Sequence, residues 1–281
     1  MITEKNRMIR YMVAEQLADS TIERYGFVYE KLKHEKKELL NRGNFFWVDY
    51  LASIGDPVYR NVIRSVVLKL CRDTFGENLK LPSVNVPVRI QPVYNIEEVS
   101  KIFSRIKNPK HYAIAMLLFT ESMRVNEVLS IRLKDCCKAD GSVMLRNTKN
   151  GSDYKKFLDK ITIEAIHKYL VWAKINNELP KELLFEGWGN KKYSPTSVRM
   201  FMKKAMRLAC MEVKGSCHIF RRSASVWKCE NDWSVTHLAA SLNNSPRAAQ
   251  KYYALVRPEF LSTLAKPIPI NKNYTNTTAL I

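Results

Sequence analysis

Three prolines interrupt this chain about a third of the way along, in the stretch Leu81-Pro-Ser-Val-Asn-Val-Pro-Val-Arg-Ile-Gln-Pro92. Proline has no amide hydrogen and disfavours helical geometry in the residue before it, so this stretch is predicted to be extended. The sequence on both sides has helical periodicity, and 281 residues are enough for two cores. We therefore predict domains at 1–85 and 94–266, a linker at 86–93 and a mobile tail at 267–281.

The first domain is predicted to be small and helical. Ser20 and Glu23 have the spacing of a capping box that opens a helix. The apolar residues that follow recur on one helical face: Ile22, Tyr25, Val28 and Leu32. Residues 61–70 are predicted to form a second, buried helix. The charged run 31–37 is either a solvated helix face or a phosphate contact.

The second domain is predicted to be mainly helical, with one small β-hairpin. Asn95 can cap a helix with Glu98 three residues on. One face of that helix is predicted to be apolar: Ile96, Val99, Phe103 and Ile106. Ser194-Pro195 can open a helix that runs to Leu208. Further helices are expected at 112–119, 163–175 and, briefly, 260–264. Residues 142–147 and 154–158 are expected to be strands joined by a turn at Asn150-Gly151.

The charge balance favours a polyanionic partner. The formal net charge is +19 and the pI is about 9.7, values typical of proteins that bind nucleic acid. The plainer reading is a basic protein without such a partner. No apolar stretch approaches the roughly 18 residues of a membrane span, and the first twenty residues lack the apolar centre of a signal peptide. We expect an intracellular protein without a membrane partner.

The cysteines and histidines do not have the spacing of metal ligands. None of the six cysteines belongs to a Cys-x-x-Cys pair, and adjacent Cys136 and Cys137 are not spaced to hold zinc together. We expect reduced thiols, no metal and no cofactor.

Five motifs in a fixed order carry the predicted chemistry. They are Glu121-Ser-Met-Arg124-Val-Asn-Glu127-Val, Thr148-Lys149-Asn-Gly151, His218-Ile-Phe-Arg221, Leu242-Asn-Asn244 and Tyr252-Tyr253. Arginine is permanently charged and binds phosphate oxygens through two nitrogens, which suits phosphoryl transfer. His218 and Arg221 are three residues apart and would share a helix face. Glu127 is placed to brace Arg124.

This order of motifs resembles that of the tyrosine recombinases, or phage integrase family. The resemblance implies that Arg124 and Arg221 bind the scissile phosphate, and that Lys149 protonates the leaving 5′ oxygen. His218 would then accept or relay the tyrosine proton. Tyr253, nine residues after Asn244, would be the nucleophile.

Some assignments within this resemblance stay open. Tyr252 is the alternative nucleophile, because counting from Gln250 favours it. Lys155 and Lys156 compete with Lys149. Two further positions depart from the family pattern. Ser122 stands where the family has glycine. Asn244 stands where the family has histidine or tryptophan, and asparagine can still donate a neutral hydrogen bond.

The resemblance implies site-specific DNA recombination, as in an integrase of a mobile element. Such an enzyme breaks and rejoins double-stranded DNA through a 3′-phosphotyrosyl link, acting as a homotetramer in the cytoplasm. A first helical domain and the catalytic domain would close around DNA, and the segment after the nucleophile would pack on a neighbouring protomer. The alternative is a DNA-binding accessory or regulatory protein that kept the fold and has weakened cleavage. A basic helical RNA-binding protein is less well supported, because no aromatic-rich RNA-binding motif is present.

Overall fold

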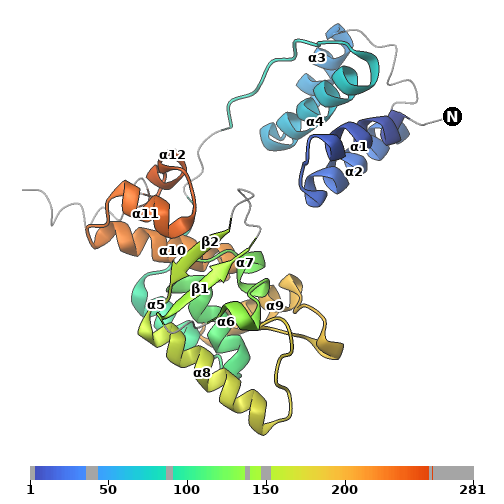
Figure 1. Cartoon of the computed structure of the whole chain (residues 1–281). Coiled ribbons are helices and arrows are strands. Elements are labelled where there is room, and N and C mark those ends of the chain that lie inside the picture. Colours follow the sequence, from blue (N-terminus) through green and yellow to red (C-terminus); the bar gives the residue numbers. More distant parts are fainter. Residues whose placement is uncertain are drawn as a thin grey trace, which may run out of the picture. The chain divides into compact units, whose positions relative to one another are not determined.

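The computed structural model describes residues 4–35, 44–86, 91–136, 140–146, 153–252 and 255. The chain divides into two compact units, Met1–Arg89 and Ile90–Ile281 (Figure 1). Both are helical, and the described strands form one two-stranded antiparallel sheet, so the predicted fold class is confirmed. Among the described helices, none is both long enough and apolar enough to cross a bilayer.

The first unit contains four α-helices and a π-helical turn in its described part. These are α1 (Glu4–Ala14), α2 (Asp19–Glu35), α3 (Asn44–Ser53), α4 (Pro57–Leu70) and η1 (Cys71–Phe75). The predicted face of α2 is confirmed, since Val28 and Leu32 are buried beside Trp47 while Ile22 and Tyr25 pack at the edges of the cores. The helix predicted at 61–70 is observed as the C-terminal part of α4.

The predicted cap at Ser20 is wrong, because α2 begins one residue earlier. The amides of Thr21 and Ile22 both donate to the carbonyl of Ala18, so the first turn is closed by the backbone. Helix α4 has the side-chain cap instead: Asp56 accepts from the amides of Val58 and Tyr59 at 2.7 and 3.1 Å. A Ser-x-x-Glu pattern thus occurred inside a helix rather than at its start.

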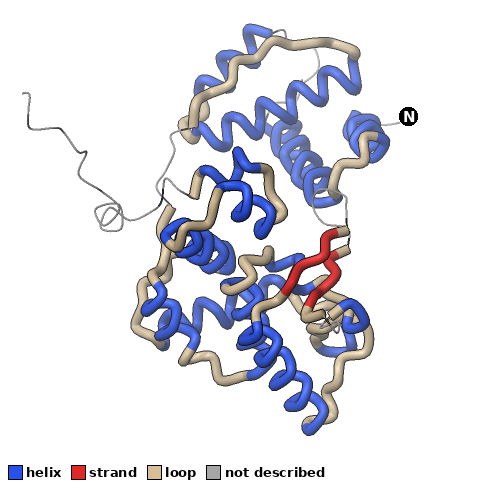
Figure 2. The backbone as a smooth tube through the Cα atoms, turned by 60° about the vertical axis from the view of Figure 1, so that its left-hand side comes forward, coloured by secondary structure: helices blue, strands red, loops and turns tan. Residues whose placement is uncertain are grey.

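The second unit places most of its helices around α6 (Figures 1 and 2). Its elements are α5 (Ile96–Phe103), α6 (Pro109–Phe119), α7 (Val125–Leu129), η2 (Leu133–Asp135), β1 (Ser142–Leu145), β2 (Tyr154–Phe157), α8 (Lys160–Ile175), η3 (Trp188–Asn190), α9 (Pro195–Leu208), α10 (Cys217–Glu230), α11 (Val235–Leu242) and α12 (Pro246–Gln250). Helix α6 is buried from Ala113 to Leu118 and packs against α7, α8, α9 and α10. This confirms the predicted core helix at 112–119.

The two strands pair antiparallel, with Ser142 opposite Phe157 and Leu145 opposite Tyr154 (Figure 2). Both predicted strands are confirmed, although Arg146 and Leu158 lie just outside the observed strands. The predicted turn at Asn150-Gly151 lies outside the described residues, as does the helix predicted at 260–264.

The two helix caps predicted in this unit are confirmed. Asn95 caps α5 in a full capping box, with its side chain 2.8 Å from the amide of Glu98 and the Glu98 carboxylate 2.7 Å from the amide of Asn95. Ser194 caps α9 as predicted. Helix α8 starts three residues before the prediction because Asp159 caps it. Ile96 was wrongly placed on the buried face of α5: its side chain is 47% exposed, and Ile102 is buried instead.

Removing the capping box should weaken the second unit. We expect Asn95→Ala to lower the free energy of unfolding by about 1 kcal/mol, because the amide of Glu98 loses its side-chain partner. Urea denaturation followed by tryptophan fluorescence would measure this. Ser100→Ala, at an exposed position of the same helix, is the control and should change stability by less than about 0.5 kcal/mol. Equal effects of the two variants would contradict the role of the cap.

Candidate active site

Four of the six predicted site residues lie together in the second unit. Arg124 is the residue that precedes α7, His218 and Arg221 lie in the first two turns of α10, and Asn244 follows α11. Nη2 of Arg124 donates to Oδ1 of Asn244 at 2.5 Å across 120 residues of sequence. The fold therefore joins the Arg124 motif to the Asn244 motif directly.

The turn before α7 fixes Arg124. Ser122 has φ +54°, a left-handed conformation that favours glycine, and this turn ends α6. Glu127 then accepts from the backbone amide of Arg124 at 2.7 Å and from its Nη1 at 2.6 Å. The predicted bracing of Arg124 by Glu127 is confirmed. The left-handed turn also explains why a glycine suits position 122.

Arg221 is almost completely buried and is held by backbone carbonyls. Its Nη1 donates to the carbonyl of Ser122 at 2.6 Å, and its Nη2 donates to the carbonyl of Leu242 at 2.7 Å. The carboxylate of Glu127 lies 3.6 Å from Nη1. Burial, and then the charge of Arg124, lower the pKa of Arg221, while Glu127 opposes this shift. Both arginines therefore share one carboxylate.

His218 faces solvent at the start of α10, beside the two arginines. Partial loss of water, followed by the positive charges of Arg221 and Arg124, lowers the pKa of His218 below its ordinary value of 6.5. The imidazole is therefore mostly neutral at pH 7, and a neutral ring nitrogen can accept a proton.

Asn244 is positioned by the end of α11. Asn243 adopts the left-handed conformation (φ 46°, ψ 56°), and the amide of Asn244 donates to the carbonyl of Ala239 at 3.0 Å. Asparagine tolerates this conformation better than most residues. Because Arg124 can only donate, the side-chain oxygen of Asn244 must face it. The side-chain nitrogen of Asn244 then points away from Arg124 and can donate a hydrogen bond to another group.

The remaining two predicted residues, Lys149 and Tyr253, lie outside the described residues. Of their alternatives, Tyr252 is 7% exposed, packs with Leu238 and Leu242, and its phenol is near enough to Arg221 to favour the charged guanidinium. Lys155 is exposed and pairs with Asp140 at 2.5 Å.

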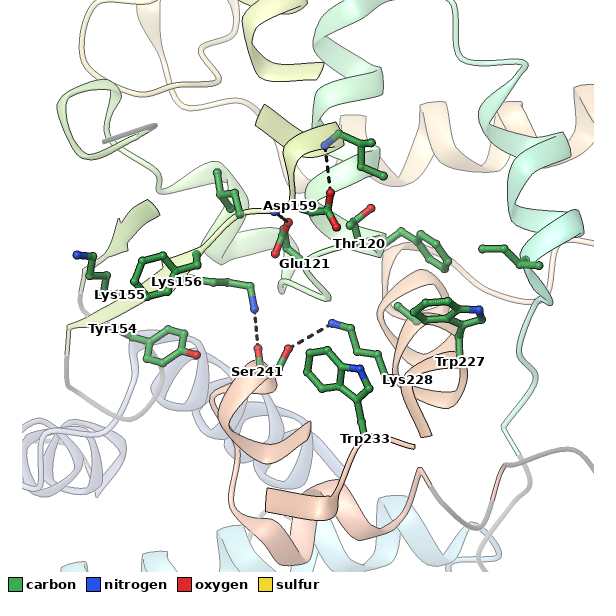
Figure 3. A pocket seen from close by; sticks show the side chains of 16 residues that line it. Thr120, Glu121, Tyr154, Lys155, Lys156, Asp159, Trp227, Lys228, Trp233 and Ser241 are labelled. Atoms are coloured by element: carbon green, nitrogen blue, oxygen red, sulfur yellow. Dashed lines mark hydrogen bonds between the residues drawn. The ribbon is translucent and has the colours of Figure 1, made fainter. Parts of the chain in front are cut away.

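Two lysines, Lys156 and Lys228, are buried near Arg221, and their burial was not predicted from the sequence. Nζ of Lys228 donates to the hydroxyl of Ser122 at 3.1 Å. It also donates to the hydroxyl of Ser241 at 3.2 Å, and Nζ of Lys156 donates to the carbonyl of Ser241 at 2.7 Å (Figure 3). Burial lowers the pKa of each to about 8. Lys228 lies seven residues after Arg221, on the same helix face, and this spacing was the available signal.

Lys156 breaks the usual alternation of a strand. Its side chain points inward and is buried, whereas the ring of neighbouring Phe157 is 65% exposed. A pattern based on hydrophobicity would place these two residues the other way round. The sequence therefore gave no local signal that Lys156 is buried.

A pocket of about 610 Å³ opens beside the two lysines (Figure 3). Glu121, Lys156 and Lys228 are among its polar lining residues, and its walls are rich in aromatic rings: Phe119, Tyr154, Phe157, Trp227 and Trp233. None of the predicted site residues is among the described residues that line it. The pocket is thus next to the arginine cluster and separate from it.

The burial of Lys156 predicts how the free energy of unfolding changes with pH. An unfolded lysine titrates near 10.5 and Lys156 in the fold near 8, so the unfolded chain binds more protons between these values and rising pH favours the fold. Lys156→Met lacks this gain. Its free energy of unfolding, relative to the unsubstituted protein, should fall by roughly 1–3 kcal/mol from about pH 7 to about pH 10. Urea denaturation at several pH values tests this, and a difference that stays level with pH would contradict it.

Comparison with known proteins gives related sequences. A profile of the phage integrase family matches residues 93–258. Tyrosine recombinase XerA of Saccharolobus solfataricus is 26% identical over 194 residues, which cover 62% of this chain and 65% of that protein, slightly less than two thirds of its length. Tyrosine recombinase XerA of Pyrococcus horikoshii is 23% identical over 259 residues, which cover 89% of this chain and 88% of that protein.

Solved structures share the fold. XerH recombinase in a post-cleavage complex with its palindromic difH substrate has a TM-score of 0.70 at 14% identity, covering 94% of this chain and 84% of that one. A λ integrase tetramer bound to a Holliday junction has a TM-score of 0.65 at 15% identity, and the match covers 89% of this chain and 76% of that one. The Tn1549 transposon integrase bound to transposon end DNA has a TM-score of 0.67 at 10% identity, covering 93% and 98%.

Proposed function

Because this chain belongs to the phage integrase family, we propose that it is a site-specific recombinase that cuts and rejoins double-stranded DNA. The observation that carries this proposal is the convergence of Arg124 and Arg221 on one carboxylate, next to His218 and Asn244. Two guanidinium groups held in place before the substrate arrives are suited to stabilise a phosphate in its transition state.

The two arginines would bind the non-bridging oxygens of the scissile phosphate. Each terminal nitrogen of a guanidinium carries two hydrogens, so the contacts of Arg221 with carbonyls leave further hydrogens for phosphate. Asn244 would add a hydrogen bond from its amide nitrogen. His218, neutral at pH 7, would accept or relay the proton of the nucleophile.

The covalent step would use Tyr253 and Lys149. The oxygen of Tyr253 attacks phosphorus and loses its proton towards His218, the bond from phosphorus to the 5′ oxygen breaks, and Lys149 gives that oxygen a proton. The products are a 3′-phosphotyrosyl link and a free 5′ hydroxyl. Attack by a 5′ hydroxyl of a partner strand reverses these steps and rejoins DNA, so the bond energy is kept in the covalent link.

The DNA partner is supported by charge and by the relatives. The net charge of +19 favours phosphate binding, and solved proteins of the same fold are bound to DNA. We propose that residues 1–85 and 94–266, joined by the linker 86–93, both contact DNA. We also propose that four protomers act together on two sites, with the chain after the nucleophile packed on a neighbour.

The nucleophile can be tested directly. Tyr253→Phe removes only the hydroxyl, so DNA binding should persist while covalent adduct disappears. The substrate is a nicked duplex from beside the protein's own gene, which releases a short strand on cleavage and traps the adduct against SDS. The reaction is run in EDTA, because the arginines and Lys149 supply the positive charge. Tyr252→Phe is the matched control and should retain adduct formation. Loss of adduct in Tyr252→Phe alone would move the nucleophile to that residue.

Asn244 distinguishes the recombinase from an accessory DNA-binding protein with weakened cleavage. We expect Asn244→Ala to slow cleavage by roughly ten- to a hundredfold, or about 1–3 kcal/mol, because one hydrogen bond to the transition state is lost. Asn244→His should remain active. If the unsubstituted protein binds DNA without cleaving it, and Asn244→His cleaves, the accessory role is supported. A native rate in Asn244→Ala would remove this residue from the site.

A further inference from the structure

The ammonium group of Lys228 joins two separate parts of the candidate site. Lys228 is 7% exposed, and its ammonium donates to the hydroxyl of Ser122. It also donates to the hydroxyl of Ser241 (Figure 3). Ser122 lies in the turn that leads to Arg124. Ser241 lies three residues before Asn244, at the end of α11. One side chain thus connects the two turns whose residues meet in the Arg124–Asn244 hydrogen bond.

Arg221 and Lys228 fasten the same two turns from one helix. Arg221 bonds the carbonyls of Ser122 and Leu242, and Lys228 bonds hydroxyls in the same turns. The two side chains are seven residues apart, so they lie one above the other on the same face of α10. Each turn therefore accepts one hydrogen bond from Arg221 and one from Lys228. Arg221 has a proposed role towards phosphate, whereas Lys228 faces the pocket behind the site.

The surroundings of Lys228 do not suit a group retained for stability. Both of its hydrogen-bond acceptors are neutral hydroxyls, so no carboxylate is bonded directly to the ammonium. The ring of Trp233, 5.0 Å from its nitrogen, makes a cation–π contact that offsets only part of the cost of burying the charge. The charges of Lys156 and Arg221 disfavour the ammonium, and Glu121 favours it. A buried charge in such a place costs stability, and an apolar side chain of similar volume is often neutral or stabilising. A more accurate placement of Arg124 relative to Asn244 would offset this cost in stability.

Resting on the function proposed above, we propose that Lys228 is a positioning residue for DNA cleavage. By bonding Ser122 and Ser241 it sets Arg124 relative to Asn244, and so orients the groups that bind the phosphate. Lys228 does not itself touch the DNA. Its loss should therefore slow the covalent step and leave DNA affinity nearly unchanged, because small misplacements of catalytic groups reduce rate strongly.

The test measures adduct formation by Lys228→Met on the nicked duplex. The rate at saturating protein should fall by roughly 10–100-fold, while the protein concentration for half-maximal binding changes by less than about twofold. The melting temperature should be equal or higher. Lys168→Met, at an exposed position of α8, is the matched control and should react at the native rate.

A second variant separates positioning from folding. Ser122→Gly relieves the left-handed strain at φ +54° and removes the hydroxyl that Lys228 bonds. It should be at least as stable as the unsubstituted protein and still cleave more slowly. The double variant Lys228→Met/Ser122→Gly should be no slower than the slower single variant, because both changes break one connection. A purely structural role would instead make the rate follow the melting temperature.

The outcomes distinguish the two proposals. If the unsubstituted protein forms no adduct, the proposed recombinase function is wrong and the role of Lys228 in cleavage falls with it. If it forms adduct and Lys228→Met does so at the same rate, only the inference about Lys228 is overturned. An equal loss of rate and DNA affinity would also overturn it, since Lys228 would then act on binding.

Discussion

A single carboxylate, that of Glu127, contacts both arginines of the candidate site. It lies 2.6 Å from Nη1 of Arg124 and 3.6 Å from Nη1 of Arg221, and it also caps the amide of Arg124. Two guanidinium groups this close repel one another, and burial strengthens the repulsion. Glu127 offsets that repulsion and fixes the first turn of α7. The placement of both arginines depends on this one side chain.

The charge around Glu127 remains unbalanced, which is consistent with an anionic substrate. Arg221, Lys156 and Lys228 are nearly fully buried, and Glu121 is the buried carboxylate beside the lysines. Fixed positive groups in a site of low polarity stabilise a phosphate more strongly than solvated ones do. The same burial disfavours both lysine charges.

Local chemistry made much of the fold predictable. The caps at Asn95 and Ser194 involve residues close in sequence, and the core helix α6 is apolar at every position from 113 to 118. Glu127 was predicted to brace Arg124 because the two residues are three apart. The cap predicted at Ser20 was wrong because the same local pattern also fits the inside of a helix. In the structure, the carbonyl of Ala18 accepts the hydrogen bonds of the first turn.

The missed features depend on tertiary structure. No local pattern places the Lys156 ammonium inward beside an outward Phe157, because the neighbouring α11 supplies its acceptor. The burial of Lys228 similarly depends on hydroxyls that lie 106 residues upstream and 13 residues downstream of it. The motif order picked out Arg124, His218, Arg221 and Asn244, which lie together in the structure, whereas the contacts that support them could be found only in the fold.

The 120-residue separation of Arg124 and Asn244 has a consequence during synthesis. Closing so long a loop carries an entropic cost that is met only when α6, α10 and α11 have packed together. A ribosome-bound chain that ends before Asn244 contains Arg124, His218 and Arg221 and lacks the contact that completes their arrangement. Incomplete chains therefore lack the completed arrangement of these side chains. Under the function proposed above, truncated products would bind DNA without the geometry to cut it.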